Sequence, residues 1–244
     1  MDPPQEKGNG PTRGAEWFVP QWGTLKFRTF IGLLFLPYTG MVLSFTVIGS
    51  VLATPVYLDR LLAIVVIYFF GLGIAAHALD ALGSKGVKPW GAVFSRAQLW
   101  LLALFFLAAA YAVAGYYMVR YVPLLWSIAL IEGFFVFAYN LELFDGRFHN
   151  DGWFAFSWGG LPVLAGYVMQ TNRFSLPAIL LAVAMALFSL IEIKVSRPYK
   201  ELKRQPCLTD QENVLLRRFE TLLKCISLGV ILLGAGLLLR RFTP

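Results

Sequence analysis

Seven apolar stretches, each close to the length of a membrane-crossing helix, run through this chain of 244 residues. They cover residues 29–53, 61–79, 98–119, 124–141, 153–169, 176–193 and 222–239. A helix needs about 20 mostly apolar residues to cross the hydrocarbon core of a bilayer. We therefore predict an all-α integral membrane protein that folds as a transmembrane bundle of about seven spans.

The composition agrees with this prediction. Only 14% of the residues are charged and 58% are hydrophobic, whereas a soluble domain carries about 25% charged residues. This balance excludes a soluble enzyme, a coiled coil and a disordered chain. Two cysteines are too few for a disulfide framework, and we expect Cys207 and Cys225 to be free thiols.

The chain divides into a tail and a single bundle. Residues 1–27 are polar at first and then aromatic, and they lack the apolar core of a secretory signal. We expect them to form a cytoplasmic tail that ends in an interfacial segment, followed by the transmembrane helical bundle over residues 28–244.

The positive charges predict the orientation. Of the 21 Lys and Arg residues, 16 lie on the side of the N-terminal tail and 5 on the other side, if all seven stretches cross. Cytoplasmic loops are the ones enriched in Lys and Arg. We therefore expect a multi-pass protein of the cell membrane with its N-terminus in the cytoplasm and its C-terminus outside. The net charge of +7 follows this topology, so we expect no nucleic-acid partner.

Polar side chains gather where the second, fourth and sixth stretches end, at the predicted cytoplasmic face. Ionisable groups near a membrane are costly and ask for a partner or a role. His77, Asp80 and Ser84 share one helical face by their spacing. The candidate site residues at the three places are His77, Asp80, Ser84, Tyr139, Glu142, Asp145, Arg147, Glu192, Arg197 and Lys200.

Carboxylates beside cations suit a magnesium-bridged diphosphate, because hard oxygen ligands hold Mg²⁺ and cations contact phosphate oxygens. The apolar bundle would hold a hydrocarbon tail, so a lipid diphosphate is the expected ligand.

Simpler explanations stand beside this one. The charges after the sixth stretch are also typical of ordinary cytoplasmic flanks, and His77 with Asp80 could form a pair that ties two helices. Glu132, midway in the fourth stretch, is either an interhelical hydrogen-bonding group or part of a cavity.

Several segments resemble the UbiA superfamily of intramembrane prenyltransferases. They are the approach LKFRTF at residues 25–30, the small residues Gly49 and Ala53, the run AAHALD at residues 75–80, and the passage YNLELFDGRFHNDGWFAFSWGGLPVLAGY at residues 139–167. The resemblance implies a UbiA-like bundle with two acidic motifs that bind Mg²⁺ and a prenyl diphosphate at the cytoplasmic ends of spans two and six.

At the three positions of the first motif this chain has His77, Asp80 and Ser84, and only Asp80 matches an acidic position. The second motif falls near Glu192, where no pair of aspartates stands. Family members have nine spans.

The resemblance implies prenyl transfer from an isoprenoid diphosphate to an aromatic or lipid-like acceptor. The resemblance implies that the catalytic residues are Asp80, Glu142 and Asp145, and that aromatic faces such as Tyr139 stabilise an allylic carbocation. The metal ligands would be the carboxylates Asp80, Glu142, Asp145 and Glu192. The substrate-binding residues would be His77, Ser84, Tyr139, Arg147, Arg197 and Lys200. The altered motifs favour an alternative function. In that case the protein has the UbiA-like bundle but does not react with diphosphates. It binds a lipid, quinone or pigment, or it acts as a structural subunit with partners in a membrane complex.

Overall fold

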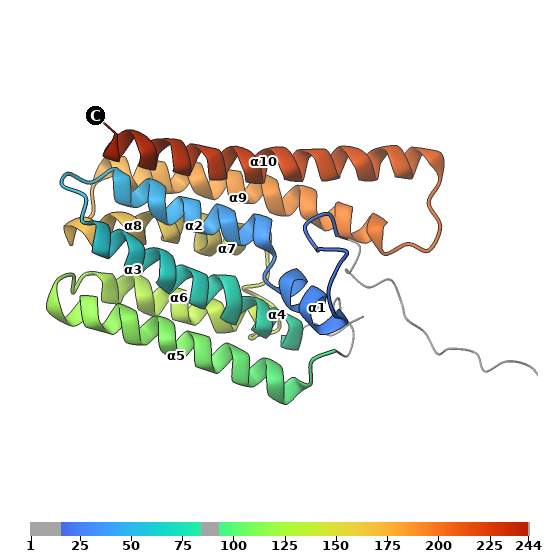
Figure 1. Ribbon diagram of the computed structural model, residues 1–244, viewed down its shortest axis with the longest axis horizontal. Helices are drawn as coiled ribbons and strands as arrows, with labels where there is room; N and C mark the ends of the chain where they lie inside the picture. The colour runs from blue at the N-terminus through green and yellow to red at the C-terminus, as the bar shows by residue number, and fades with distance from the viewer. Residues whose placement is uncertain (1–15, 84–92, 244) are drawn as a thin grey trace, which may run out of the picture.

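The computed structural model describes residues 16–83 and 93–243, and the regular structure within these ranges is entirely helical. The predicted all-α class is therefore confirmed for this part of the chain. The helices lie nearly parallel in an elongated bundle, with α1 at one end and the C-terminus at the other (Figure 1). Among the predicted site residues, Ser84 lies outside the described ranges.

The helices run back and forth along the bundle, and some of them follow one another end to end in one continuous stretch (Figure 1). We call each such helix or continuous stretch of helices a rod. The elements in chain order are α1 (Leu25–Leu33), α2 (Leu36–Val51), α3 (Leu58–Tyr68), the π-helix η2 (Phe69–Ala76), α4 (His77–Gly83), α5 (Arg96–Arg120), α6 (Leu125–Asn140), α7 (Asp151–Phe154), the π-helix η3 (Ala155–Gly160), α8 (Leu161–Thr171), α9 (Leu176–Lys203) and α10 (Asp210–Phe242). The π-helices interrupt rods that the sequence predicts as regular.

Five helical stretches in the described residues are long and apolar enough to cross a membrane, as expected of a multi-pass membrane protein. They are Leu25–Val51, Leu58–Gly83, Arg96–Arg120, Leu176–Lys203 and Asp210–Phe242. Helix α6 has only 16 residues, about 24 Å at 1.5 Å per residue against a hydrocarbon core of about 30 Å. The stretch from Asp151 to Thr171 consists of three short helices. The number of seven spans therefore stays a prediction.

Helix α2 packs against α8 with their backbones in contact. A Cβ atom at Gly49 would overlap the carbonyl oxygen of Val163, and one at Gly166 would overlap that of Thr46. The Ser50 hydroxyl donates a hydrogen bond to the Gly166 carbonyl oxygen at 3.2 Å. Small residues that allow such close approach are typical of helix interfaces in membranes, where no hydrophobic force draws the helices together.

Outward-facing side chains of the long helices are apolar. Leu101 and Phe105 on α5 are 71% and 64% exposed, and Leu180 on α9 and Leu232 on α10 are 62% and 69% exposed. Exposed apolar patches on this scale are not tolerated in water. They are the surface that lipid chains would cover.

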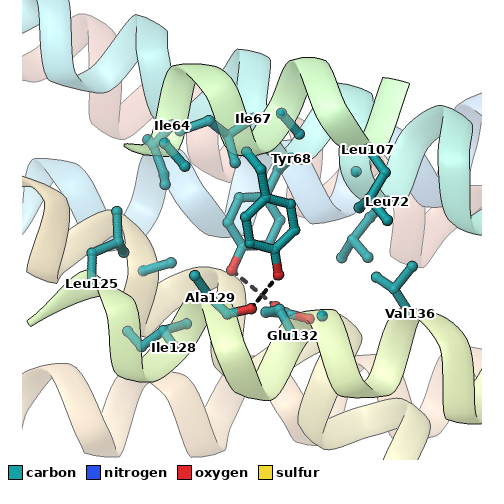
Figure 2. A pocket seen from close by; sticks show the side chains of 16 residues that line it. Ile64, Ile67, Tyr68, Leu72, Leu107, Leu125, Ile128, Ala129, Glu132 and Val136 are labelled. Atoms are coloured by element: carbon teal, nitrogen blue, oxygen red, sulfur yellow. Dashed lines mark hydrogen bonds between the residues drawn. The ribbon is translucent and has the colours of Figure 1, made fainter. Parts of the chain in front are cut away.

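Glu132 connects α6 to α3 inside the bundle (Figure 2). Its Oε1 atom accepts a hydrogen bond from the Tyr68 hydroxyl at 2.9 Å, and its side chain also borders a cavity. Both alternatives that the sequence leaves open for Glu132 are therefore realised together.

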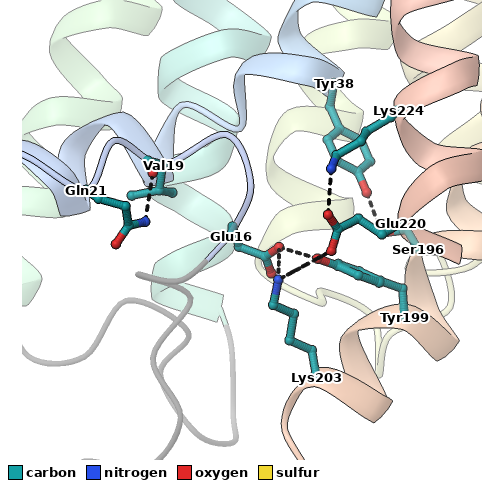
Figure 3. Close-up of polar contacts among 9 residues, drawn as sticks. All are labelled: Glu16, Val19, Gln21, Tyr38, Ser196, Tyr199, Lys203, Glu220 and Lys224. Carbon is teal, nitrogen blue, oxygen red and sulfur yellow. Dashed lines mark hydrogen bonds and ion pairs between the residues drawn. The ribbon is translucent and has the colours of Figure 1, made fainter. Parts of the chain in front are cut away.

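The segment before α1 packs on the end of α9 and on the first half of α10 (Figure 3). The carboxylate of Glu16, a residue only 3% exposed, accepts a hydrogen bond from the Tyr199 hydroxyl at 2.8 Å and lies 3.4 Å from the Lys203 ammonium. Lys224 lies 5.2 Å from the centre of the Trp17 ring. The predicted interfacial segment is thus partly incorporated into the bundle, whereas Trp22 remains 70% exposed.

Candidate functional site

Polar side chains from α4, α6, α7 and α9 meet at the end of the bundle where α1 lies. Tyr139 is central, because its hydroxyl lies within electrostatic range of Asp80, Glu192 and Arg197, and Arg197 is within hydrogen-bonding reach of it. Tyr139 is 5% exposed, so the contact is shielded from solvent. We call Asp80, Tyr139, Asp151, Lys194 and Arg197 the polar cluster.

Asp151 joins the polar cluster through α9. Its Oδ1 atom lies 3.0 Å from Nε of Arg197, and its Oδ2 atom lies 3.4 Å from the ammonium of Lys194. The two cations are three residues apart and therefore share one face of α9. A further atom of the guanidinium, Nη2 of Arg197, is buried and has no hydrogen-bond partner among the described residues.

A row of aromatic rings, two of its four ring pairs stacked and two tilted, runs beside the polar cluster. The ring centroids of Tyr139 and Phe154 are 5.8 Å apart, those of Phe154 and Trp158 are 5.5 Å apart, and those of Trp158 and His77 are 5.3 Å apart. The His77 ring stacks in turn on Phe35, at 5.6 Å. We call these five residues the aromatic row. Their spacing is that of favourable aromatic pairs.

Two π-helices shape this part of the bundle. Helix η2 ends directly before His77, and η3 carries Trp158. Gly159 lets η3 approach α9, because a Cβ atom there would lie 2.8 Å from Cα of Ala186. Single π turns inside α-helices are frequent at functional sites.

Lys200 and Glu192 also lie on α9, where Lys200 follows Arg197 by three residues. The Lys200 ammonium is 5.0 Å from the centre of the Phe35 ring and 5.5 Å from that of Tyr38, so it extends the row of cations beside the aromatic row. Glu192 is 3% exposed and shares a small pocket with Lys200. Its Oε1 atom has no hydrogen-bond partner among the described residues.

The turn after α6 holds the remaining predicted residues. Asp145 and Arg147 are exposed there, and Glu142 is half-buried. Glu142 and Asp145 have φ values of +50° and +56°, in the left-handed region that non-glycine residues rarely adopt. From the same turn, Nδ1 of His149 lies 2.9 Å from the Tyr139 carbonyl oxygen.

The predicted magnesium ligands do not come together as a set. Within residues 16–83 and 93–243, no three His, Cys, Asp or Glu side chains are close enough to hold a metal ion. Asp151 is paired with Arg197 and Lys194, and Lys200 lies within electrostatic range of Glu192. These residues do not fit a magnesium site built from protein carboxylates alone, and they suit an anionic group better.

Sequence reasoning left two parts of this site without a role. Asp151 and Lys194 belong to the polar groups at the ends of the fourth and sixth stretches, but they were not among the predicted site residues. Phe35, Phe154 and Trp158 carry no signal in a chain with 21 Phe and 7 Trp residues, because only their placement distinguishes them from lipid-facing rings.

Comparisons of the chain with protein-family models, with curated proteins and with solved structures found no match. Membership of the UbiA superfamily therefore stays a prediction from the motifs.

Proposed function

We propose that this chain is a UbiA-like membrane prenyltransferase, which binds an isoprenoid diphosphate at the polar cluster and transfers the prenyl group to an aromatic or lipid-like acceptor. One observation carries the proposal. Three cations of α9, namely Lys194, Arg197 and Lys200, follow the aromatic row at one end of an apolar bundle.

The cations supply the first requirement of this reaction. When the allylic carbon–oxygen bond breaks, the diphosphate leaves with both bonding electrons, and its negative charge grows. Arg197 can donate a charge-assisted hydrogen bond to its oxygens through Nη2, which has no hydrogen-bond partner among the described residues. Lys194 can do the same if the diphosphate replaces its contact with Asp151. Such preorganised donors stabilise the developing charge.

The aromatic row supplies the second requirement. The departing diphosphate leaves an allylic carbocation, which is attracted to the faces of aromatic rings. Tyr139, Phe154 and Trp158 are each between 5% and 8% exposed, so water has little access to these faces. The acceptor then donates an electron pair to the carbocation to form the new bond and releases a proton.

Mg²⁺ remains part of the proposal as a prediction of the resemblance. Asp80 is the motif residue that would contact it, and when bound it would neutralise diphosphate charge. In this proposal the cations of α9 perform the same task, so the assay measures the dependence on Mg²⁺.

Topology completes the proposal. We infer that all seven rods cross the cell membrane, with the polar cluster on the cytoplasmic side. Helix α1 lies near α4, which carries Asp80 of the polar cluster, and the C-terminus lies at the other end of the bundle (Figure 1). Cysteine-accessibility labelling of intact cells, with single cysteines placed at Trp22 and Arg241 in a chain lacking Cys207 and Cys225, would test this orientation. Labelling of both positions from the same side would contradict it.

A second candidate function is non-catalytic. The chain would then be a lipid-, quinone- or pigment-binding protein or a structural subunit of a membrane complex. The ion pairs of Asp151 with Arg197 and Lys194 favour this alternative, because they already neutralise two of the cations. Purification would discriminate the two, since a structural subunit is recovered with stoichiometric partners.

The deciding experiment uses purified protein in nanodiscs and radiolabelled geranylgeranyl diphosphate, with and without Mg²⁺. Retained label measures binding, and released pyrophosphate on addition of membrane lipid extract measures transfer. Asp80→Asn and Arg197→Gln should lower pyrophosphate release. Arg173→Gln, which removes an exposed cation from the turn before α9, is the matched control. No binding of the diphosphate by folded protein, with or without Mg²⁺, would refute the proposal.

A further inference from the structure

A cavity of about 60 Å³ lies in the middle of the bundle, away from the polar cluster. Helix α3 with η2, helix α5 and helix α6 surround it (Figure 2). Its walls are almost entirely apolar and include Ile64, Leu72, Leu107, Ile128 and Val136. Glu132 precedes Tyr139 by seven residues on α6, about 10 Å along the helix.

Glu132 lines this cavity and carries one oxygen without a hydrogen-bond partner among the described residues. The residue is 9% exposed, and its Oε1 atom accepts the hydrogen bond from Tyr68. Its Oε2 atom is buried and has no hydrogen-bond partner among the described residues. The other hydroxyl at the cavity, that of Tyr111, donates to the Ala129 carbonyl oxygen at 2.5 Å instead.

A purely structural role does not account for this arrangement. A hydrogen bond that only joins α3 to α6 needs neither a second, unpaired oxygen nor empty space beside it. Leaving a buried polar atom unpaired costs about 1–3 kcal/mol, and an ionisable group inside a membrane is costly as well. The cost of the unpaired atom is recovered if a ligand brings one hydrogen-bonding group to Oε2.

The cavity also has an entrance from the lipid side. Its lining residues Leu107 and Tyr111 on α5 and Ala129 and Gly133 on α6 are only half-buried. The neighbouring Leu104 on the same surface is 51% exposed. A molecule dissolved in the membrane can therefore place one end in the cavity and leave the rest among lipid chains.

We propose that this cavity binds the hydroxyl head group of a lipid-soluble alcohol through Oε2 of Glu132. A hydroxyl fits because it donates to an ionised carboxylate and accepts from a protonated carboxyl group, so it pairs with Glu132 in either state. One hydroxyl suffices for one unpaired oxygen, and the apolar walls exclude a charged or strongly polar head group. A volume of about 60 Å³ holds a hydroxyl with a few carbon atoms, since one water needs about 10–15 Å³ on the same measure.

The inference does not depend on the proposed transferase activity. Binding at Glu132 involves neither the polar cluster nor a diphosphate. Diphosphate binding and alcohol binding can therefore be measured and can fail separately.

The test uses the full chain in nanodiscs and a matched pair of photoreactive probes. One is an aliphatic alcohol with a diazirine in its chain, and the other is the same molecule with hydrogen in place of the hydroxyl group. After irradiation, mass spectrometry locates the labelled peptides. We expect the alcohol to label peptides around Leu107 and Ile128 about tenfold more than the alkane does, as one hydrogen bond to a buried carboxyl group implies.

Two variants remove the site in different ways. Gly71→Leu fills the cavity from η2, where an added Cβ atom meets nothing within 4 Å. Gly115→Leu on α5 is the matched control, because a Cβ atom there also meets nothing and Gly115 does not line the cavity. Glu132→Leu removes the oxygen, whereas Glu132→Gln keeps a group that can pair with a hydroxyl.

We expect selective labelling to be lost in Gly71→Leu and Glu132→Leu and to persist in Gly115→Leu and Glu132→Gln. If Glu132→Leu does not fold, the labelling of Gly71→Leu still tests whether the alcohol binds in the cavity. Equal labelling by alcohol and alkane, which a cavity holding only water would give, would overturn the proposal. Selective labelling that survives Gly71→Leu would overturn it too.

Discussion

Replacing Asp151 by asparagine tests whether the cations of α9 bind the diphosphate. In the protein, Asp151 lies 3.0 Å from Arg197 and 3.4 Å from Lys194, and a diphosphate must compete with these contacts. Asparagine has nearly the same shape but no charge, so both cations are released. Without Mg²⁺, the substitution should therefore tighten diphosphate binding.

The size of the effect follows from the exposure of the ion pairs. The side chains of Asp151, Arg197 and Lys194 are 24%, 42% and 62% exposed, so solvent screens both contacts. Partly exposed pairs are worth about 0.2–1 kcal/mol each. Releasing two of them corresponds to about 0.4–2 kcal/mol, or about 2- to 30-fold in Kd.

The assay is equilibrium binding of geranylgeranyl diphosphate to protein in nanodiscs with EDTA present, repeated at several salt concentrations. The gain should shrink as salt screens the charges. Asp210→Asn is the matched control, because Asp210, like Asp151, lies in the first turn of a helix, but it is exposed and lies on α10. Unchanged or weaker binding by Asp151→Asn in EDTA would refute the reasoning. Weakening that occurs only with Mg²⁺ would instead identify Asp151 as a metal ligand.

Three further predictions concern the aromatic row and the packing of the bundle. Trp158→Leu should lower the rate of pyrophosphate release about tenfold or more and leave the Kd of the diphosphate within a factor of about two. The reason is that cation–π contacts of about 1–2 kcal/mol are formed only with the carbocation. An equal loss of diphosphate binding would contradict this prediction. Gly166→Ala should lower the stability of the bundle by about 1–3 kcal/mol, because the added Cβ atom overlaps the backbone of α2. The loss would be measured as a lower Tm in detergent. Gly229→Ala is the control and should leave Tm unchanged or slightly higher, because an added Cβ atom meets nothing there. The buried Gln170 amide accepts a hydrogen bond from the Tyr57 N–H at 2.7 Å and donates one to the Tyr57 carbonyl oxygen at 3.2 Å. Gln170→Leu should therefore lower the free energy of unfolding by about 1–3 kcal/mol for each backbone group that it leaves unpaired. An unchanged Tm would show that water replaces these bonds.

The rods of the bundle were predictable because their signal is local. Apolar runs separated by charged or proline-containing turns mark each rod, and every predicted stretch overlaps a helical rod of the structure. The breaks inside the rods were not predictable. Helices η2 and η3 form where neighbouring helices decide how a glycine-containing segment packs, and Gly159 is an example because its approach to Ala186 depends on α9.

The sequence by itself determined the helical class, the apolar character of the long helices and the gathering of Asp80, Tyr139 and Arg197 at one end of the bundle. These features follow from hydropathy and from charges at helix ends, which are properties of neighbouring residues. Only the tertiary structure decided that Asp151, rather than Glu142 or Asp145, faces the cations of α9. It also decided that Glu132 keeps one oxygen unpaired beside a cavity. Both depend on which side chains from distant helices meet, and no local pattern in the sequence encodes that meeting.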